Sequence, residues 1–553
     1  MTWRIDDPQG NEAGKIKHLI VPYTRGQGLD LGCGPWKAYP HFISVDNFDE
    51  WRGLEWAPDV RGDCTDLSMF ADASLDFVFS SHLLEHLDNT EAALAAWWRV
   101  IKPGGHLVLY LPHKHHYPNI GEHGANPDHR HDFLPEDIIG HMERVGGWDL
   151  VRNQTRVQDC EYSFFQVYRK GKGKHHKHSW KSQEATEDSA PRCLVIRYGG
   201  IGDMIMASSI LPGLKKQGFH VTLNTTPRGH EIIRADPHID DFLLQDIDQV
   251  PNAELGSYWQ ALGNEFDHVV NLCESIEGAL LALPDRRNFA LPPDARDMVM
   301  NVNYLEFTHK IAGVPFPLQQ KFYPTGIEAG RARAFRRSLG PGPVILWALS
   351  GSAVHKAWPW TDNVVVWLLE QHPNARIILC GDPRSQVLEM AIIQKLAEKF
   401  LGLDAETSDG MKLSELLGLL KTHWGGENKV ICTSGAWSIR DTLSIAREVD
   451  MVVGPETGVL NAVGLEEVAK VLMLSHSSAE NLTKHWVNTI TIQPTAGCHP
   501  CHRMHYGWEY CPQDEKTGAA ECASSIEPQR VFNAITVRLS SQAPAPRLIA
   551  ASS

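Results

Sequence analysis

Two glycine-rich turns, each between a strand-like run and a helix, constrain the fold of this chain more than any other feature. The first turn lies in residues 28–34 (GLDLGCG), and the second lies in residues 193–203 (CLVIRYGGIGD), before an apolar run at 204–214 that predicts a helix. Each places glycine where backbone approaches a ligand closely, at a helix N-terminus that favours negative charge. Two such turns so far apart predict two nucleotide-type sites on one polypeptide.

Length and composition narrow the class of protein. A chain of 553 residues is too long for one core, and 42% apolar with 22% charged residues is typical of a globular protein. No apolar run approaches the ~18 residues of a membrane span, and the N-terminus lacks a basic-then-apolar signal pattern. We therefore expect a soluble cytoplasmic protein. The net charge of -15 argues against broad nucleic-acid binding, although the basic run 172–177 could make a local contact.

The order of strand-like and helical runs predicts three α/β domains. Residues 1–170 form the first, and 171–191 form a polar linker without periodicity. Residues 192–335 and 336–540 form the second and third, because strand-like runs alternate with helical stretches, which predicts parallel sheets. In the third domain these runs are 344–347, 376–380, 429–433, 451–453 and 468–474. A helix at 527–538 is expected to pack back onto the last sheet, and the tail 541–553, rich in Ser, Ala and Pro, is expected to be disordered.

The first domain carries an ordered series of motifs. After the first turn a second strand ends at Asp46, where an acidic group suits ribose hydroxyls. Asp63 comes next, then a strand that leads to His82, and then a Lys-Pro-Gly-Gly turn before the strand 106–111. A dinucleotide fingerprint would carry a third glycine where Trp36 and Lys37 stand. Over residues 25–169 the series resembles the Rossmann-like, type 11-like S-adenosylmethionine-dependent methyltransferases.

The resemblance implies a role for each motif residue. It implies that Asp30, Gly32 and Gly34 form the loop that holds the methionine side of the cofactor. It also implies that Asp46 binds the ribose, that Asp63 lies beside the adenine and that His82 borders the methyl-transfer pocket. Two alternatives stay open: another kind of nucleotide-binding Rossmann domain, and a methyltransferase domain without activity.

A histidine-rich segment, residues 113–132, follows the strand after the Lys-Pro-Gly-Gly turn, on the side where acceptors enter such folds. His129, His131 and Asp132 could bind a metal, deprotonate an acceptor hydroxyl or line a polar pocket. A polar acceptor loop ranks ahead of a metal site. If a base is needed, His129 and His131 are the first candidates.

Four sequence segments after residue 192 follow one another in a characteristic order. They are 196–207 (IRYGGIGDMIMA), 350–359 (SGSAVHKAWP), 453–462 (VGPETGVLNA) and a cysteine-bearing C-terminal segment. Together they resemble glycosyltransferase family 9, the ADP-heptose:lipopolysaccharide heptosyltransferases, over residues 192–540. The resemblance implies the GT-B architecture, in which two Rossmann-like domains face a cleft, with the acceptor on the first and the nucleotide sugar on the second. It also implies inverting transfer without a catalytic metal.

The resemblance implies that Asp203 is the general base. A carboxylate at a helix N-terminus is stabilised as the anion, so its alternative role is that of a helix cap. Lysine would meet the leaving phosphates as a point charge, and backbone N–H groups at a helix start would bind the diphosphate. The nucleotide-sugar residues are Ser350, Lys356, Glu456, Thr457 and Gly458. Glu456 stands where many members carry Asp, which leaves the choice of sugar or nucleotide open.

Four cysteines gather near the C-terminus: Cys498, Cys501, Cys511 and Cys522. His499, His502 and His505 add further ligands, and a structural zinc would accept such a set. The second pair lacks C-x-x-C spacing, so the pattern is not that of a zinc ribbon. Free thiols and a structural disulfide are the alternatives, and a reducing cytosol disfavours the disulfide.

These features predict an α/β protein with three Rossmann-like domains and two activities in glycan assembly, such as lipopolysaccharide biosynthesis. One is sugar transfer from an ADP-heptose-like donor to a hydroxyl acceptor, and the other is methylation of a sugar or related hydroxyl from S-adenosylmethionine. Peripheral contact with a lipid-linked acceptor is compatible with this. The alternatives are a glycosyltransferase with a non-catalytic scaffold domain, and a non-glycan acceptor such as nucleic acid or protein. On this interpretation the second turn shapes the acceptor side of a cleft rather than binding a second nucleotide.

Overall fold

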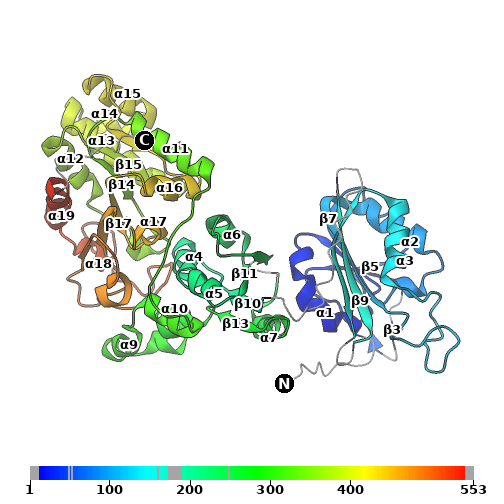
Figure 1. The fold of residues 1–553 in the computed structure, drawn as a ribbon. Coiled ribbons are helices and arrows are strands. Elements are labelled where there is room, and N and C mark those ends of the chain that lie inside the picture. The colour runs from blue at the N-terminus through cyan, green and yellow to red at the C-terminus, as the bar shows by residue number, and fades with distance from the viewer. Residues whose placement is uncertain are drawn as a thin grey trace, which may run out of the picture. The chain divides into compact units, whose positions relative to one another are not determined.

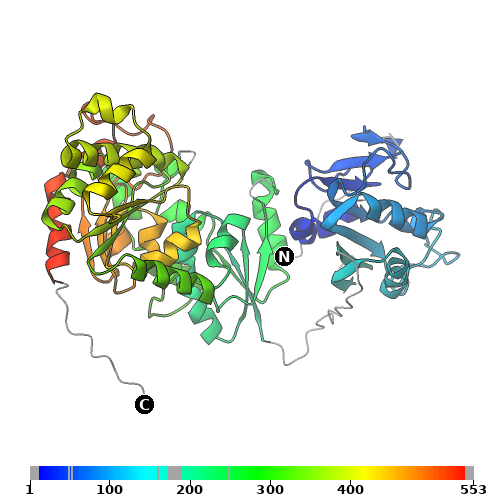
Figure 2. The same ribbon diagram turned by 90° about the horizontal axis from the view of Figure 1, so that it is seen from above.

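The chain forms two compact units, seen in a computed structural model (Figure 1 and Figure 2). The structure describes residues 11–47, 50–51, 54–157, 161–171, 190–246, 249–284 and 286–541. The first unit comprises residues 1–191 and 243–268, and the second comprises 192–242 and 269–553. Within the described ranges, no helix is both long enough and apolar enough to span a bilayer. Most of the predicted linker (172–189) and tail (542–553) lie outside the described residues.

The first unit is built on a seven-stranded sheet of order β5-β2-β1-β6-β7-β9-β8. The first five strands in this order, from β5 through β2, β1 and β6 to β7, pair in parallel. Strand β9 runs antiparallel to both β7 and β8. The central strand β1 is buried at every position, as expected where both faces of a parallel sheet are covered. The strands of the seven-stranded sheet are β1 (Gly28–Leu31), β2 (Ile43–Asp46), β5 (Val60–Arg61), β6 (Leu75–Ser81), β7 (Ile101–Pro112), β8 (Trp148–Arg156) and β9 (Ser163–Lys170). Two further strands, β3 (Glu50–Trp51) and β4 (Leu54–Glu55), form a separate antiparallel pair.

Short helices and turns connect these strands. They are α1 (Glu12–Ile20), η1 (Val21–Tyr23), η2 (Leu84–His86), α2 (Thr90–Val100), α3 (Pro135–Val145), η4 (Asn252–Glu254) and α7 (Leu255–Gly263). The stretch around Glu85 forms a single 3-10 turn, η2. Because η2 directly follows β6, its side chains lie at the carboxyl end of the sheet, where open α/β folds bind ligands.

A segment from much later in the chain belongs to the first unit. Residues 243–268 carry α7, which packs against α1. Ion pairs join Lys17 to Glu254 at 2.9 Å and Arg156 to Glu265 at 3.2 Å. Tyr258 and Ala261 are buried. The first unit therefore extends beyond the predicted domain 1–170.

The second unit contains two further sheets. The smaller has the order β12-β11-β10-β13, and the larger has the order β16-β15-β14-β17-β18-β19 with every pairing parallel. Its strands are β10 (Arg192–Ile196), β11 (His220–Thr225), β12 (Asp241–Leu244), β13 (His268–Asn271), β14 (Val344–Ala348), β15 (Arg376–Cys380), β16 (Val430–Cys432), β17 (Met451–Pro455), β18 (Ala469–Met473) and β19 (Thr489–Ile492). The α/β class with parallel sheets is confirmed.

Helices alternate with these strands. They are α4 (Ile201–Ala207), η3 (Ser208–Ile210), α5 (Leu211–Lys216), α6 (Pro227–Ile233), α8 (Ser275–Ala279), η5 (Arg287–Ala290), α9 (Pro293–Met300), α10 (Tyr304–Ala312), α11 (Gly326–Ser338), η6 (Val354–Lys356), α12 (Thr361–Gln371), η7 (Pro383–Ser385), α13 (Gln386–Leu401), α14 (Ala405–Asp409), α15 (Leu413–His423), α16 (Ile439–Ala446), α17 (Gly458–Val463), η8 (Ala479–Thr483), α18 (Glu521–Ser524) and α19 (Pro528–Ser541).

Two of these helical regions differ from expectation, and a third agrees with it. The apolar run 204–214 is divided among α4, η3 and α5 rather than forming one helix, because Pro212 can stand in the first turn of α5 but not inside a continuous helix. Helix α11 crosses residue 335, where a domain boundary was predicted, and packs on α16. Helix α19 packs on α12, β18 and β19 as expected, with Val531 and Ile535 in the core.

Candidate active sites

The first glycine turn lies between the ends of β1 and β2. Gly32 and Gly34 have positive φ angles of 65° and 56°, which side-chain-bearing residues rarely adopt. The N–H of Gly34 donates to Oδ2 of Asp46 at 3.2 Å, so the turn and the acid at the end of β2 adjoin. Backbone N–H groups, space beside Gly34, where a Cβ would meet nothing, and a buried carboxylate fit the methionine and ribose ends of S-adenosylmethionine.

The other cofactor residues have local partners. Asp30 is buried and accepts the Ala38 N–H at 2.7 Å, and burial raises the pKa of its carboxyl to about 7. Asp63 is exposed and accepts from the backbone and hydroxyl of Thr65, both at 2.8 Å. Asp63 closes a local turn after β5 through Oδ1, and its Oδ2 can accept a hydrogen bond from a ligand.

His82 begins a histidine–carboxylate cluster just after β6. Its Nε2 lies 2.9 Å from the Ser163 hydroxyl, and its Nδ1 lies 3.6 Å from Oε1 of Glu85. His86 and His129 approach the same Oε1 with their Nε2 atoms, at 3.9 and 4.0 Å. Burial raises the pKa of Glu85 to about 8 and, with the adjacent His86, lowers that of His129 to about 4. His129 is therefore a neutral imidazole at neutral pH, with an unprotonated ring nitrogen that binds a proton only weakly.

The other predicted residues of the histidine-rich loop point elsewhere. His131 places Nε2 2.9 Å from the Leu87 carbonyl and stacks on Phe133, whereas Asp132 accepts the Ile120 N–H at 3.0 Å. Both residues hold the loop in shape. Of the three residues singled out in this segment, His129 is the one that joins the cluster around Glu85.

Asp203, at the end of the second glycine turn, is held in place by the turn itself and by a buried arginine. Asp203 accepts the Gly200 N–H through Oδ2 at 2.8 Å and pairs through Oδ1 with Arg197 at 2.5 Å. Arg197 is fully buried at the end of β10 and also pairs with Glu277 at 2.8 Å. About a third of the Asp203 side chain is exposed, 32%, so it remains open to an acceptor.

The starts of α4 and α17 meet beside Asp203, with a glycine in the first turn of each helix. A Cβ on Gly458, the first residue of α17, would lie 2.4 Å from the Cβ of Ile201, the first residue of α4. A Cβ on Gly202 would lie 3.1 Å from Asn461 Nδ2. The starts of these helices, from different sheets, can come this close because both positions lack side chains.

Lys356 and Glu456 are buried near this junction. Burial lowers the pKa of Lys356, while the charges of Glu456 and Asp203 oppose that shift. Despite burial, the pKa of Glu456 lies well below its usual range because of His476, 2.7 Å away, Lys356 and donation from the Ser475 N–H. The structure thus places the predicted base, lysine and glutamate close enough for their charges to interact.

The remaining nucleotide-sugar residues lie around this group. Ser350 bonds to the Ser385 hydroxyl at 2.9 Å and lies just before Gly351, where a Cβ would meet the Lys356 side chain. Thr457 caps α17 through its backbone position, and its buried hydroxyl has no hydrogen-bond partner among the described residues. That oxygen is available to a ligand at the helix start.

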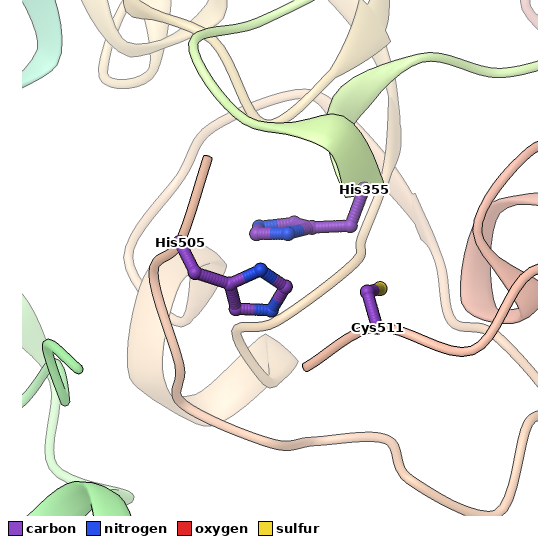
Figure 3. Close-up of side chains that lie close together, drawn as sticks. All are labelled: His355, His505 and Cys511. Carbon is purple, nitrogen blue, oxygen red and sulfur yellow. The ribbon is translucent and has the colours of Figure 1, made fainter. Parts of the chain in front are cut away.

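The cysteine segment is organised around Cys511. Cys511 interacts with Cys522 and His505, which together lower the pKa of its thiol to about 5 in spite of burial. The side chains of His355, His505 and Cys511 are close enough to share a metal ion, and they come from η6 and from the loop between β19 and α18 (Figure 3). Cys498 is exposed and Cys501 half-buried. This group contains Cys511 and adds His355, which the spacing did not suggest. The other three predicted thiols lie near enough to interact electrostatically with Cys511 or with one another, so the four-cysteine set remains a prediction.

Comparisons with known proteins agree with the first resemblance. Residues 29–109 match a family model described as a methyltransferase domain. The first unit contains a methyltransferase domain. A solved S-adenosylmethionine-dependent methyltransferase from Archaeoglobus fulgidus is similar over 29% of this chain and 92% of its own, with 18% identity and a TM-score of 0.24.

Two solved structures are similar to a larger share of the chain. ADP-heptose lipopolysaccharide heptosyltransferase II of E. coli has 13% identity over 63% of this chain and 99% of its own, with a TM-score of 0.40. A glycosyltransferase family 9 protein from Veillonella parvula has 14% identity over 64% and 98%, with a TM-score of 0.42. No curated protein matches the chain. Both resemblances stated from the sequence recur among these comparisons.

Sequence reasoning missed several residues of these sites. Arg197, His476, Glu85 and His86 were not assigned roles, although each lies at or just after the carboxyl end of a parallel strand. Ligands bind at that edge in open α/β sheets, so a search for polar residues directly after each predicted strand would have found them.

Proposed function

We propose that the protein is a bifunctional enzyme of glycan assembly that transfers a sugar from a nucleotide donor and methylates a hydroxyl group from S-adenosylmethionine. The observation that carries the sugar-transfer half is the convergence of Asp203, Lys356 and Glu456, which are far apart in the sequence. A base, a cation and a helix start with free N–H groups are what displacement of a nucleoside diphosphate needs.

In the proposed transfer, Asp203 takes the proton of the acceptor hydroxyl. The acceptor oxygen bonds to the anomeric carbon as the bond from that carbon to the diphosphate breaks. Lys356 and the N–H groups at the start of α17 stabilise the charge that develops on the departing phosphate. A single displacement inverts the anomeric configuration. The donor we propose is an ADP-heptose-like nucleotide sugar, and the acceptor is a glycan, including one linked to lipid.

The methyltransferase domain supports the second activity. S-adenosylmethionine supplies a methyl group on a positively charged sulfur. Gly32, Gly34 and Asp46 would hold the cofactor, and His129, neutral at neutral pH, would take the acceptor's proton. A second hypothesis keeps the domain as a binding or scaffolding module, and a third directs both activities to a protein or nucleic-acid acceptor.

Release of nucleoside diphosphate tests sugar transfer. The full chain is incubated with a panel of nucleotide sugars and glycan acceptors, alongside Lys356→Met and the control Lys399→Met. Lys399 is half exposed and pairs with Glu370, away from the proposed site. We expect acceptor-dependent release that falls at least 100-fold in K356M and persists in K399M. Equal rates in both variants would contradict the assignment of Lys356.

Calorimetric titration with S-adenosylmethionine tests the first domain. Asp46→Asn should weaken binding, whereas Asp88→Asn, at an exposed side chain, should not. Binding followed by methyl transfer to a glycan supports the bifunctional proposal. Binding without transfer supports the scaffold hypothesis, and transfer to protein or nucleic acid supports the third. Absence of binding rejects methylation of any acceptor and leaves a scaffold that does not use the cofactor.

We also infer that His355, His505 and Cys511 hold a structural zinc. Two imidazoles and a low-pKa thiol match the ligand types that zinc prefers. Metal analysis of the purified full chain should find zinc, and Cys511→Ser should lower the zinc content by one equivalent. Unchanged metal content in that variant would reject these three residues as the ligand set.

A further inference from the structure

The histidine–carboxylate cluster of the first unit, made of His82, Glu85, His86 and His129, surrounds a carboxylate that lacks hydrogen bonds. Glu85 is fully buried, yet neither of its carboxylate oxygens has a hydrogen-bond partner among the described residues. A buried, unsatisfied carboxylate is costly, and such groups in native proteins are normally paired or coordinate a metal. The neighbouring imidazoles approach Oε1 only to 3.6–4.0 Å, beyond hydrogen-bonding distance.

These separations suit ligands around one ion. The ligand atoms of Glu85, His86 and His129 all lie within 4.8 Å of one another. Bonds of about 2.1 Å from zinc to nitrogen or oxygen place tetrahedral ligand atoms about 3.4 Å apart. The observed 3.9 and 4.0 Å from Oε1 of Glu85 to the two imidazole nitrogens exceed that value by about half an ångström.

The surroundings orient the imidazole of His86. Its Nδ1 lies 3.2 Å from the carbonyl oxygen of Asp128. A carbonyl only accepts, so Nδ1 carries the proton and the lone pair of Nε2 faces Glu85. Metal-binding histidines characteristically donate their second ring N–H to such an acceptor, which fixes the tautomer.

The backbone joins the two segments that carry the cluster. The N–H groups of Arg130 and His131 donate to the Glu85 carbonyl at 2.7 and 3.1 Å. The loop with His129 is thereby fastened to turn η2, which carries Glu85 and His86. The ligand set is therefore largely formed before any ion binds, at the carboxyl ends of β6 and β7.

We propose that Glu85, His86 and His129 form a binding site for a divalent transition-metal cation, with Zn²⁺ as the best match. Two histidines and a carboxylate leave a fourth position open in a tetrahedral site. His86 is partly exposed, which gives that position access to water or to an acceptor oxygen. The imidazole ligands disfavour Mg²⁺ and Ca²⁺, which prefer oxygen. A metal-bound His129 is a ligand and not a base, so this role and the proton transfer proposed above exclude each other. Metal binding itself does not depend on either proposed activity.

Cobalt titration of the full chain tests the site. The Cys511→Ser variant serves as background, because it removes the thiol of the other candidate metal group. After chelation, Co²⁺ and Zn²⁺ are titrated calorimetrically and by visible absorption into this background and into versions that also carry Glu85→Gln, His129→Ala or His123→Ala. His123 is an exposed histidine of the same loop and is the matched control.

We expect one equivalent of Co²⁺ in the background and in the His123→Ala version, with ligand-field bands and no thiolate-to-cobalt charge transfer. Affinity should fall at least tenfold with Glu85→Gln and with His129→Ala, while circular dichroism stays unchanged. Mg²⁺ should not compete. No bound Co²⁺ or Zn²⁺ in the background, or equal affinity in all versions, would overturn the proposal whether or not the protein methylates or transfers sugar.

Discussion

At the scale of single residues, Asp203 in the second glycine turn is both exposed and hydrogen-bonded. Asp203 has the exposure a base needs, yet both of its oxygens already accept a hydrogen bond, from buried Arg197 and from Gly200. Those bonds hold the carboxylate in one orientation. An acceptor hydroxyl would therefore approach a positioned carboxylate through the exposed part of its side chain.

Replacing Asp203 by Asn separates these roles. We expect the rate of sugar transfer to fall about 100-fold or more, as for loss of a general base, with nucleotide binding nearly unchanged. Glu277→Gln is the matched control, because it also removes a carboxylate partner of Arg197 but lies outside the proposed chemistry. Turnover retained in D203N, or lost equally in E277Q, would assign Asp203 to structure instead.

Glu456 is a buried charge whose partners surround it. It accepts from the N–H groups of Ser475 and Ser477 at 2.6 and 3.1 Å and pairs with His476. Its pKa lies below the ordinary value of 4.5, so its stabilising contribution is complete above pH 4.5 and is lost as pH falls below that value.

Glu456→Gln should therefore destabilise the second unit by about 3 kcal/mol at pH 7, because it leaves buried donors without their anion. The deficit should shrink when pH is lowered below 4.5. Denaturant unfolding at pH 7 and pH 4 measures both values, with Glu480→Gln, at a half-exposed pair with Lys484, as the control. A deficit independent of pH would show that Glu456 acts through its shape and not its charge.

At the scale of elements, glycine decides how closely two helices approach. The start of α17 packs on the start of α4 because Gly458 leaves no Cβ between them. This contact brings the second glycine turn to the helix whose N–H groups are proposed to bind phosphate. A small sequence motif thus serves packing and ligand binding together.

Gly458→Ala should push these helices apart and destabilise the unit by about 1–3 kcal/mol, the usual cost of overpacking. Gly418→Ala in α15 is the control, since a Cβ there meets nothing within 4 Å, and we expect it to stabilise by up to about 1 kcal/mol. Melting temperatures give the signs. Wild-type stability in G458A would mean that the contact relaxes without cost.

At the scale of the whole molecule, the first unit is discontinuous in sequence. Helix α7 buries Tyr258 and Ala261 in this unit, and the side chain of Gln249 donates to the Val21 carbonyl. A fragment ending at residue 170 lacks this segment. The methyltransferase domain in the full chain is therefore the proper object for binding studies.

Ala261→Arg should dislodge α7, because an arginine does not fit a buried alanine site. A cost of about 1.4 kcal/mol or more corresponds to at least tenfold faster amide exchange in α1 and α7. Ala253→Arg, at an exposed position just before α7, is the control. Hydrogen–deuterium exchange of the full chain provides the readout, and unchanged protection of α1 in A261R would show that α7 does not stabilise it.

The sequence alone determined the parts of this protein that depend on local pattern. Alternating apolar runs and glycine turns predicted β14, β15 and β18 within a residue or two, and they predicted the α/β class, because strand periodicity and turn chemistry are local properties. The methyltransferase motif series was equally readable, and the predicted roles of Asp203 and Lys356 remain predictions.

Only the tertiary structure decided what lies next to what. It joined His355 to Cys511, His86 to His129, and α7 to α1, none of which spacing could suggest. Distance along the chain carries no information about distance in space once loops cross between sheets. Convergence of side chains, and the burial that shifts their pKa values, arise when separate elements pack together.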